Sequence, residues 1–184
     1  MKNKSSDERV MIFIDGSNHY HIVKAMFPEK KQKNFDFENF VKEIVGNRKL
    51  VRVYYYNCPL DIGKNIKAYM KQQQFFDNLR RIQNFKLILC RMQKVKVDNK
   101  IIYQVKEDDI HLAVDMVKLA YNNAYDTAIL VSTDGDFVPA VQAVKEIGKN
   151  VENIGFETKF SYHLKQECDK FVKFNKEQIK KFFN

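Results

Sequence analysis

One stretch of the sequence, Ala128 to Val138, constrains the fold more than any other. Its start, Ala128 to Val131, has the length and the branched side chains of a buried strand. Two carboxylates, Asp134 and Asp136, follow around a glycine, and apolar residues then recur at helical spacing. A strand, a tight turn and a helix form the repeating unit of parallel α/β sheets, with the turn at the carboxyl end of the strand.

A second acidic turn follows the first apolar run of the chain. Val10 to Ile14 reads as a buried strand that runs directly into Asp15 and Asn18. Sites in α/β proteins form where strands end, so we expect the two acidic turns to lie together. Anions held there repel each other unless a cation or a proton lies between them. Asp134 is also a candidate N-cap for the helix that follows, and this alternative stays open.

Apolar periodicity divides the rest of the chain into alternating strands and helices. Further strands are predicted at 50–56, 85–89 and 150–154, an apolar segment at 170–174, and helices at about 18–27, 35–45, 64–83, 107–123, 137–147, 162–166 and up to 183. Two alternating runs around Asp98 and Asn99 predict a β-hairpin. This order implies an α/β fold with a mostly parallel sheet covered on both faces, and a small hairpin insertion.

The helix expected at 107–123 supplies a third carboxylate. Asp109 shares its face with Met116 and other apolar residues, the side expected to pack on the sheet. A carboxylate at the start of an apolar stripe is costly unless a charged group meets it, so we expect Asp109 beside the two acidic turns. The alternative is an ordinary aspartate at a helix start. Asp108 and Asp115 fall on the polar stripe, and Asp115 is expected to face solvent and pair with a lysine.

The converging carboxylates indicate a metal site. The candidate ligands are Asp15, Asp109, Asp134 and Asp136. All-oxygen sites select hard divalent ions, here Mg²⁺ or Mn²⁺. Such an ion lowers the pKa of a bound water and holds phosphodiester oxygens during an in-line displacement. Asn18 is a candidate to orient that water or a phosphate oxygen.

Composition narrows the partner and the compartment. A chain of 184 residues with 45% hydrophobic content predicts one domain at 10–184, after a polar, flexible tail at 1–9. No apolar run approaches the roughly 18 residues of a membrane span. Three cysteines without paired spacing disfavour structural zinc and disulfides and fit a cytoplasmic setting. The net charge of +9 favours nucleic acid as a partner, with a lysine-rich proteome as the alternative.

Basic and aromatic residues suggest where such a partner would lie. Candidates for contacts to a nucleic-acid backbone are Lys64, Lys67, Lys71, Lys94, Lys96 and Lys106. Contacts of this kind position a nucleic acid without reading its sequence. Three consecutive tyrosines, 54–56, offer either a stacking ring or packing within the sheet.

The segments around the acidic positions resemble the NYN domain family, specifically its LabA-like branch, within the PIN-like nuclease superfamily. The matching segments are 13–18, 106–120 and 125–139, and the resemblance extends over about 10–174. The resemblance implies a PIN-like three-layer α/β/α sandwich and a metal-dependent ribonuclease. Because PIN-like proteins often pair, it also suggests a homodimer. The acidic positions of the family carry over to Asp15, Asp109, Asp134 and Asp136, and its lysine to Lys106. The departures are extra acids at 107–108 and Ser132-Thr133 before the acidic turn.

Three functions are therefore weighed. The leading hypothesis is a Mg²⁺- or Mn²⁺-dependent endoribonuclease that acts on single-stranded or structured RNA. The second is a non-catalytic RNA-binding module on the same fold. The third, a phosphatase of the haloacid dehalogenase type, is disfavoured because that chemistry needs a second acid two residues after the first, where this chain has Ser17. Nucleotide kinases and dinucleotide enzymes are disfavoured because neither a P-loop nor a GxGxxG motif occurs.

Overall fold

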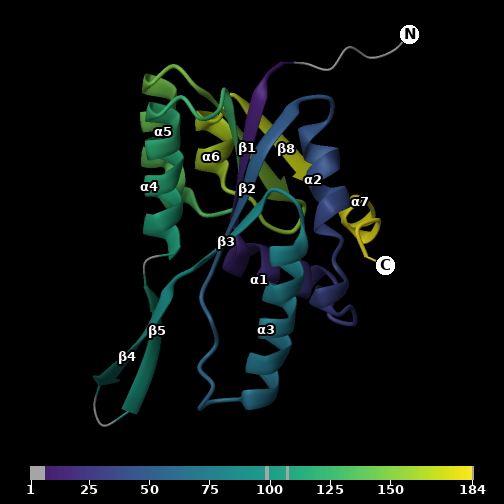
Figure 1. Cartoon of the computed structure of the whole chain (residues 1–184), viewed down its shortest axis with the longest axis vertical. Helices are drawn as coiled ribbons and strands as arrows, with labels where there is room; N and C mark the ends of the chain where they lie inside the picture. The colour runs from purple at the N-terminus through teal and green to yellow at the C-terminus, as the bar shows by residue number, and fades with distance from the viewer. Residues whose placement is uncertain (1–6, 98–99, 107, 184) are drawn as a thin grey trace.

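A central sheet of six parallel strands organises the computed structural model, which describes residues 7–97, 100–106 and 108–183 (Figure 1). The strand order is β3-β2-β1-β6-β7-β8. The strands are β1 (Arg9–Asp15), β2 (Lys49–Asn57), β3 (Phe85–Leu89), β6 (Thr127–Val131), β7 (Asn150–Phe156) and β8 (Lys170–Phe174). The predicted α/β class and mostly parallel sheet are confirmed, and the segment at 170–174 proves to be a sixth strand.

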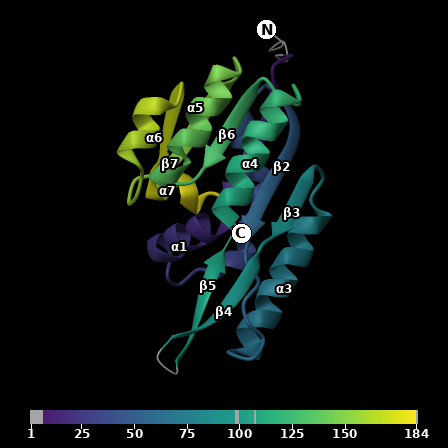
Figure 2. The same cartoon turned by 90° about the vertical axis from the view of Figure 1, so that its left-hand side faces the viewer.

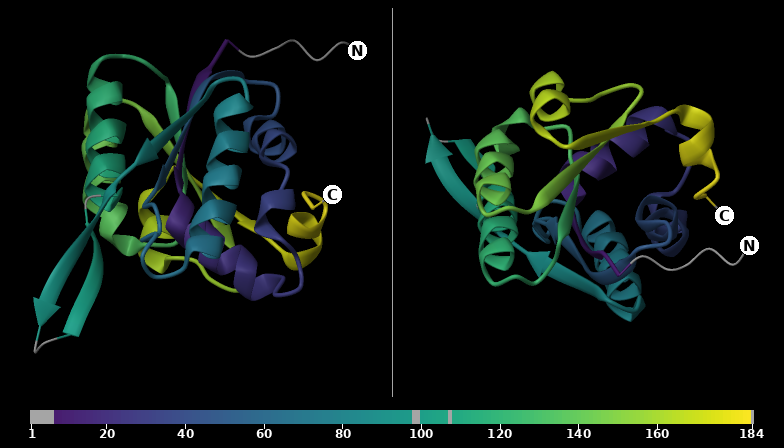
Figure 3. Two further views of the ribbon diagram at one scale, coloured as in Figure 1. Left: turned by 60° about the horizontal axis from the view of Figure 1, so that its bottom comes forward. Right: turned by 90° about the horizontal axis from the view of Figure 1, so that it is seen from above.

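Helices cover both faces of this sheet, as the two views in Figure 3 show. The helices are α1 (Gly16–Met26), η1 (Gln32–Asn34), α2 (Phe37–Val45), α3 (Ile66–Arg81), α4 (Asp108–Tyr121), η2 (Gly135–Phe137), α5 (Val138–Glu146), α6 (Tyr162–Glu167) and α7 (Lys176–Lys180). Alternate residues of β1 serve the two layers: Ile12 packs with residues of α1, α2, α3 and α7, and Phe13 packs with those of α4, α5 and α6. A strand buried on both faces is apolar throughout, as 10–14 is.

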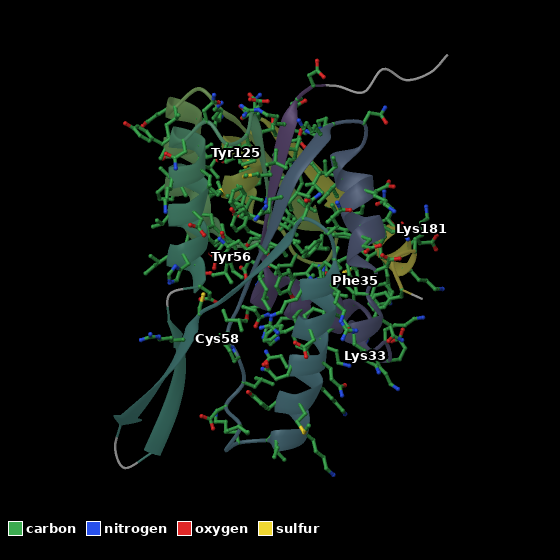
Figure 4. All side chains as sticks on the ribbon, in the orientation of Figure 1. Lys33, Phe35, Tyr56, Cys58, Tyr125 and Lys181 are labelled. Carbon is green, nitrogen blue, oxygen red and sulfur yellow. The ribbon has the colours of Figure 1, made fainter. Side chains whose placement is uncertain are left out.

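Aromatic residues fill both layers. Tyr56 and Tyr125 lie between the sheet and α4, whereas Phe35 lies on the opposite side (Figure 4). The hydroxyl of Tyr56 donates to Asp115 at 2.9 Å, and that of Tyr125 donates to a backbone carbonyl of α4 at 2.7 Å. The three tyrosines at 54–56 are all buried, so they pack within the sheet and do not form a stacking surface.

The predicted hairpin is present as β4 (Arg91–Val97) and β5 (Lys100–Lys106), an antiparallel pair. Lys106 ends β5 opposite Arg91, and Lys94 pairs with Tyr103. The hairpin and α3 both extend beyond the edge of the sheet at which the strands end (Figure 2). The turn predicted at 98–99 and the side chains of the hairpin lysines lie outside the described residues.

The first strand begins at Arg9, within the predicted tail, and residues 1–6 lie outside the described part. Arg9 is anchored by Asp126, whose carboxylate accepts from its guanidinium at 2.7 Å. The carboxylate of Glu8 also accepts from the Thr127 hydroxyl at 2.6 Å. Within the described residues, no helix is both long and apolar enough to cross a bilayer.

The direction of strand addition reverses between β1 and β6. From β1 the chain moves outward through β2 to β3 and later returns to place β6 on the other side of β1. At such a reversal, the connections after the two central strands leave on opposite sides and open a crevice at the carboxyl edge of the sheet. Asp15 ends β1 and Ser132 follows β6, so the fold brings the two predicted acidic turns to this point.

Candidate functional site

Asp15 stands at the centre of the crevice, held by hydrogen bonds on both carboxylate oxygens. Oδ1 accepts from the backbone N–H of Asn18 at 2.9 Å and so caps α1, and Oδ2 accepts from the Ser132 hydroxyl at 3.0 Å. Asp15 is only 6% exposed. These bonds tie the end of β1 to the residue after β6 and fix the direction of the carboxylate.

Burial raises the pKa of Asp15 from 3.8 to about 6. Loss of hydration is the largest cause, because a buried anion loses the solvation that stabilises its charge. The bonds from Asn18 and Ser132 oppose this increase, and the negative charges of Asp108 and Asp134 add to it. A carboxylate in this environment is stabilised by a nearby cation or by a proton.

The turn after β6 places its two carboxylates differently. Asp134 borders the crevice and also caps η2, since its Oδ1 accepts from the backbone N–H of Asp136 at 3.0 Å. The N-cap alternative is therefore correct as local structure, and the same side chain also faces the groove. Asp136 is exposed and is not among the residues that line the groove.

Two neighbouring acids at the start of α4 complete the acidic wall. Asp108 and Asp109 both line the groove, with Asp108 half-buried and Asp109 exposed. Partial desolvation, followed by the charges of Asp108, Asp15, Asp134 and Asp136, raises the pKa of Asp109 to about 6. The expectation that Asp109 lies on the face of α4 packed against the sheet is wrong, because Asp109 is exposed, whereas Asp108, on the polar stripe, also borders the groove. The prediction for Asp115 is wrong as well, because this residue is half-buried and accepts from the Tyr56 hydroxyl.

Two asparagines hold the turn after β6 in place. The side-chain oxygen of Asn18 accepts from the backbone N–H and the hydroxyl of Thr133, at 3.2 and 3.1 Å. From β7, the buried amide of Asn153 donates to the carbonyl of Ser132 at 2.9 Å. The oxygen of Asn18 is thus engaged in positioning the site, although the residue still borders the groove.

The acids line an open groove of about 600 Å³ whose other residues come from α1 and from the segment after β7. The full lining is Asp15, Ser17, Asn18, His21, Ile22, Ala25, Asp108, Asp109, Asp134, Thr158 and Lys159. Sequence reasoning missed His21 and Lys159. His21 could have been found from its position one helical turn after Asn18, whereas only the position of β7 beside β6 brings Lys159 to the groove.

The predicted lysines lie elsewhere. Lys64, Lys67 and Lys71 are exposed at or before the start of α3 and do not line the groove. That part of α3 projects beyond the same edge of the sheet as the acids (Figure 1). The side chains of Lys94, Lys96 and Lys106 lie outside the described part of the chain.

The donors of the groove suit a hard divalent cation in chemical type. Carboxylate oxygens are the ligands that Mg²⁺ and Mn²⁺ prefer, and the charges that raise the pKa of Asp15 and Asp109 all come from other carboxylates. Among the described residues, however, no three acidic, histidine or cysteine side chains stand in a ready metal-ligating cluster.

Comparisons with known proteins agree with this architecture. A crystal structure of a protein of unknown function from Vibrio parahaemolyticus superposes with a TM-score of 0.69, at 25% identity, over 94% of this chain and 96% of that one. An uncharacterized protein of Methanocaldococcus jannaschii is 41% identical over 69 residues, which are 38% of this chain and 29% of that protein. The matched part of this chain thus corresponds to less than a third of that relative's length.

The fold is thus a parallel α/β/α sandwich with carboxylates at the switch point of its sheet. Residues 9–175 match the NYN domain, and the chain belongs to the NYN domain family. The family generally comprises nucleases that process nucleic acids, which supports a hydrolase of this broad class.

Proposed function

We propose that this protein is a Mg²⁺- or Mn²⁺-dependent endoribonuclease of the LabA-like branch of the NYN family. The observation that carries the proposal is the buried carboxylate of Asp15, which shares one groove with Asp108, Asp109 and Asp134. Burying an anion beside other anions is costly unless a cation or a proton neutralises it, and we infer that a cation does so here. The resemblance of 13–18, 106–120 and 125–139 to the branch supports the finer assignment.

Asp15, Asp109 and Asp134 would hold the ion. When bound, it would supply a water of lowered pKa and charge neutralisation for the phosphodiester. The protein holds the acids in place. Hydrogen bonds from the Ser132 hydroxyl and the Asn18 N–H orient the Asp15 carboxylate, and the bond that caps η2 orients Asp134. Asp136 acts at longer range, through its charge on Asp109. The open groove leaves room for a polymer to pass.

The test is cleavage of labelled single-stranded RNA in Mg²⁺, in Mn²⁺ and in EDTA. We expect cleavage with either ion and none in EDTA. Asp134→Asn should abolish it, whereas Asp77→Asn, at an exposed position on α3, should leave it unchanged. The folded state of each variant is checked by circular dichroism.

The second candidate is a non-catalytic RNA-binding module. The net charge of +9 supports it, because a basic protein binds a polyanion whether or not it cleaves it. It predicts salt-sensitive RNA binding without cleavage, unchanged by Asp134→Asn and by EDTA. That combination would overturn the nuclease assignment.

A further inference from the structure

The segment between β7 and α6 forms a rim of the groove beside the acidic turn. Thr158 and Lys159 line the groove directly. A Cβ on Gly135, between the two carboxylates of the turn, would come within 3.3 Å of the Ser161 hydroxyl oxygen, so the segment lies against that turn. Reciprocal backbone hydrogen bonds of 3.0 and 3.1 Å between Phe156 and Lys159 hold Lys159 on a tight turn. A lysine is thus fixed at the edge of an acidic groove.

Two neighbouring rings, each with an ammonium group close to it, lie beyond Lys159. The ring of Phe160 lies 5.6 Å from that of Phe171. The ammonium of Lys173 lies 5.6 Å from the Phe160 ring, and that of Lys165 lies 5.9 Å from the Phe171 ring. Phe160 is 40% exposed and Tyr162, the first residue of α6, is 62% exposed. We call this surface the aromatic rim; it comprises Lys159, Phe160, Tyr162, Lys165, Phe171 and Lys173.

The sheet beneath supports Phe160 and Phe171 of the rim. A Cβ on Gly155 of β7 would lie 2.8 Å from the Phe171 ring and 2.9 Å from Cβ of Phe160, so both residues rest directly on the strand backbone. The ring of Phe171 and the start of the Phe160 side chain are therefore fixed in position, and Phe160 is still partly open to solvent. A rigid ring costs little conformational entropy when another flat group stacks on it.

Single-stranded nucleic acid matches this chemistry. Exposed rings stack with unpaired bases, and neighbouring ammonium groups neutralise the phosphates between them. A duplex keeps its bases stacked inside the helix and offers the rings no flat face. The rim also continues directly from the groove through Lys159, so one strand could occupy both.

We propose that the aromatic rim binds the single-stranded segment that flanks the phosphodiester in the groove. Phe160 and Tyr162 stack with bases, and Lys159, Lys165 and Lys173 contact phosphates. The inference rests on the proposed function, which places a nucleic acid in the groove. It adds that this nucleic acid is single-stranded and that the aromatic rim holds it.

The experiment is fluorescence anisotropy with a labelled 12-nucleotide single-stranded RNA and with the matching duplex, in EDTA so that no cleavage occurs. Tyr162→Ala and Phe160→Ala should each weaken single-strand binding about tenfold and change duplex binding little. Tyr162 is the safer position, since its side chain is largely exposed. The matched control is Tyr121→Ala, at a tyrosine that is 80% exposed on α4, and it should bind as the native protein does.

A second variant tests the charge. Lys159→Gln should reduce the slope of log affinity against log salt by about 1, whereas Lys118→Gln on α4 should leave the slope unchanged. Unchanged single-strand binding in both aromatic variants would overturn the inference and assign the exposed rings to a protein partner. Equal losses for duplex and single strand would overturn it as well.

The inference and the proposed function fail in distinguishable ways. If RNA is cleaved in a metal-dependent manner but the aromatic variants bind normally, the rim is wrong and the nuclease stands. If no cleavage occurs but the aromatic variants bind single strands more weakly, the rim is correct on a non-catalytic module.

Discussion

The fold holds the carboxylate of Asp15 in an environment that opposes its charge. This residue is 6% exposed, and its pKa rises from 3.8 to about 6. Between these two values Asp15 binds more protons in the folded protein than in the unfolded chain, so its contribution to the free energy of unfolding falls as the pH rises. In the absence of a divalent ion, the destabilisation begins near pH 4 and is complete somewhat above pH 6.

The size of the effect follows from the two pKa values. Their difference corresponds to about 3 kcal/mol, of which about 2 kcal/mol falls between pH 4 and pH 6. The asparagine of Asp15→Asn cannot ionise. As the pH rises from 4 to 6, the free energy of unfolding of this variant should therefore increase by about 2 kcal/mol relative to that of the native protein. Removing the charge also lowers the pKa of Asp109, which adds in the same direction. The hydrogen bonds that the variant loses affect its stability similarly at every pH and cancel in this difference.

The assay is urea unfolding, followed by circular dichroism, at several pH values between 4 and 7 in EDTA. The native protein and Asp15→Asn are compared, with Asp77→Asn as the control for removing an exposed carboxylate. Parallel curves for the native protein and Asp15→Asn would refute the reasoning, because they would show that the Asp15 charge costs nothing in the folded state.

Three further predictions test the site and its supports. In thermal unfolding at pH 7.5, Mn²⁺ at about 100 times its dissociation constant should stabilise the native protein by about 3 kcal/mol, and Asp134→Asn by much less. Tyr56→Phe should lower the free energy of unfolding by about 2 kcal/mol, because the Asp115 carboxylate loses the hydrogen bond from the Tyr56 hydroxyl. The control is Tyr54→Phe, which also removes one hydroxyl from the sheet, and equal losses in the two variants would contradict the assignment. Gly16→Ala should cost about 3 kcal/mol in denaturant unfolding, since its Cβ would clash with the Tyr55 ring and stand 2.6 Å from a backbone oxygen; a neutral result would contradict the geometry.

The sheet and the acidic groove were accessible from the sequence for one physical reason. In a parallel sheet, local signals fix strand direction, and all the carboxyl ends meet at one edge. Apolar runs that end in Asp15 and in the turn of Asp134 therefore specify a shared location without any knowledge of distant contacts. The structure places both carboxylates around one groove, together with Asp109.

What could not be predicted depends on contacts between distant segments. A helical wheel orders residues around α4 but does not show which flank meets the sheet, so Asp115 was assigned to solvent although it accepts from Tyr56. Lys159 carries no local signal at all. It reaches the groove because β7 lies next to β6 and the tight turn after β7 folds back toward the acids.

His19 provides the counterpart to Asp15 in the pH dependence of stability. It is 2% exposed, its Nε2 has no hydrogen-bond partner among the described residues, and the rings of Phe35 and Phe37 lie 4.9 and 5.3 Å away. Desolvation lowers its pKa from 6.5 to about 3. The unfolded chain therefore takes up a proton below about pH 6.5 that the folded protein excludes, so stability falls as the pH decreases.

The contributions of these two groups to stability nearly cancel between pH 4 and pH 6. Over this interval, rising pH adds about 2.5 kcal/mol through His19 and removes about 2 kcal/mol through Asp15. The pKa of Asp109 is raised as well and adds a further decrease with rising pH, so the test compares slopes. We expect the free energy of unfolding to rise more steeply with pH in Asp15→Asn than in the native protein, and to fall more steeply in His19→Phe, measured by urea unfolding in EDTA. If His19→Phe keeps the native slope, the imidazole is not held neutral. Mn²⁺ should remove the Asp15 contribution and make the native slope more positive, because a cation stabilises the carboxylate without affecting the buried imidazole.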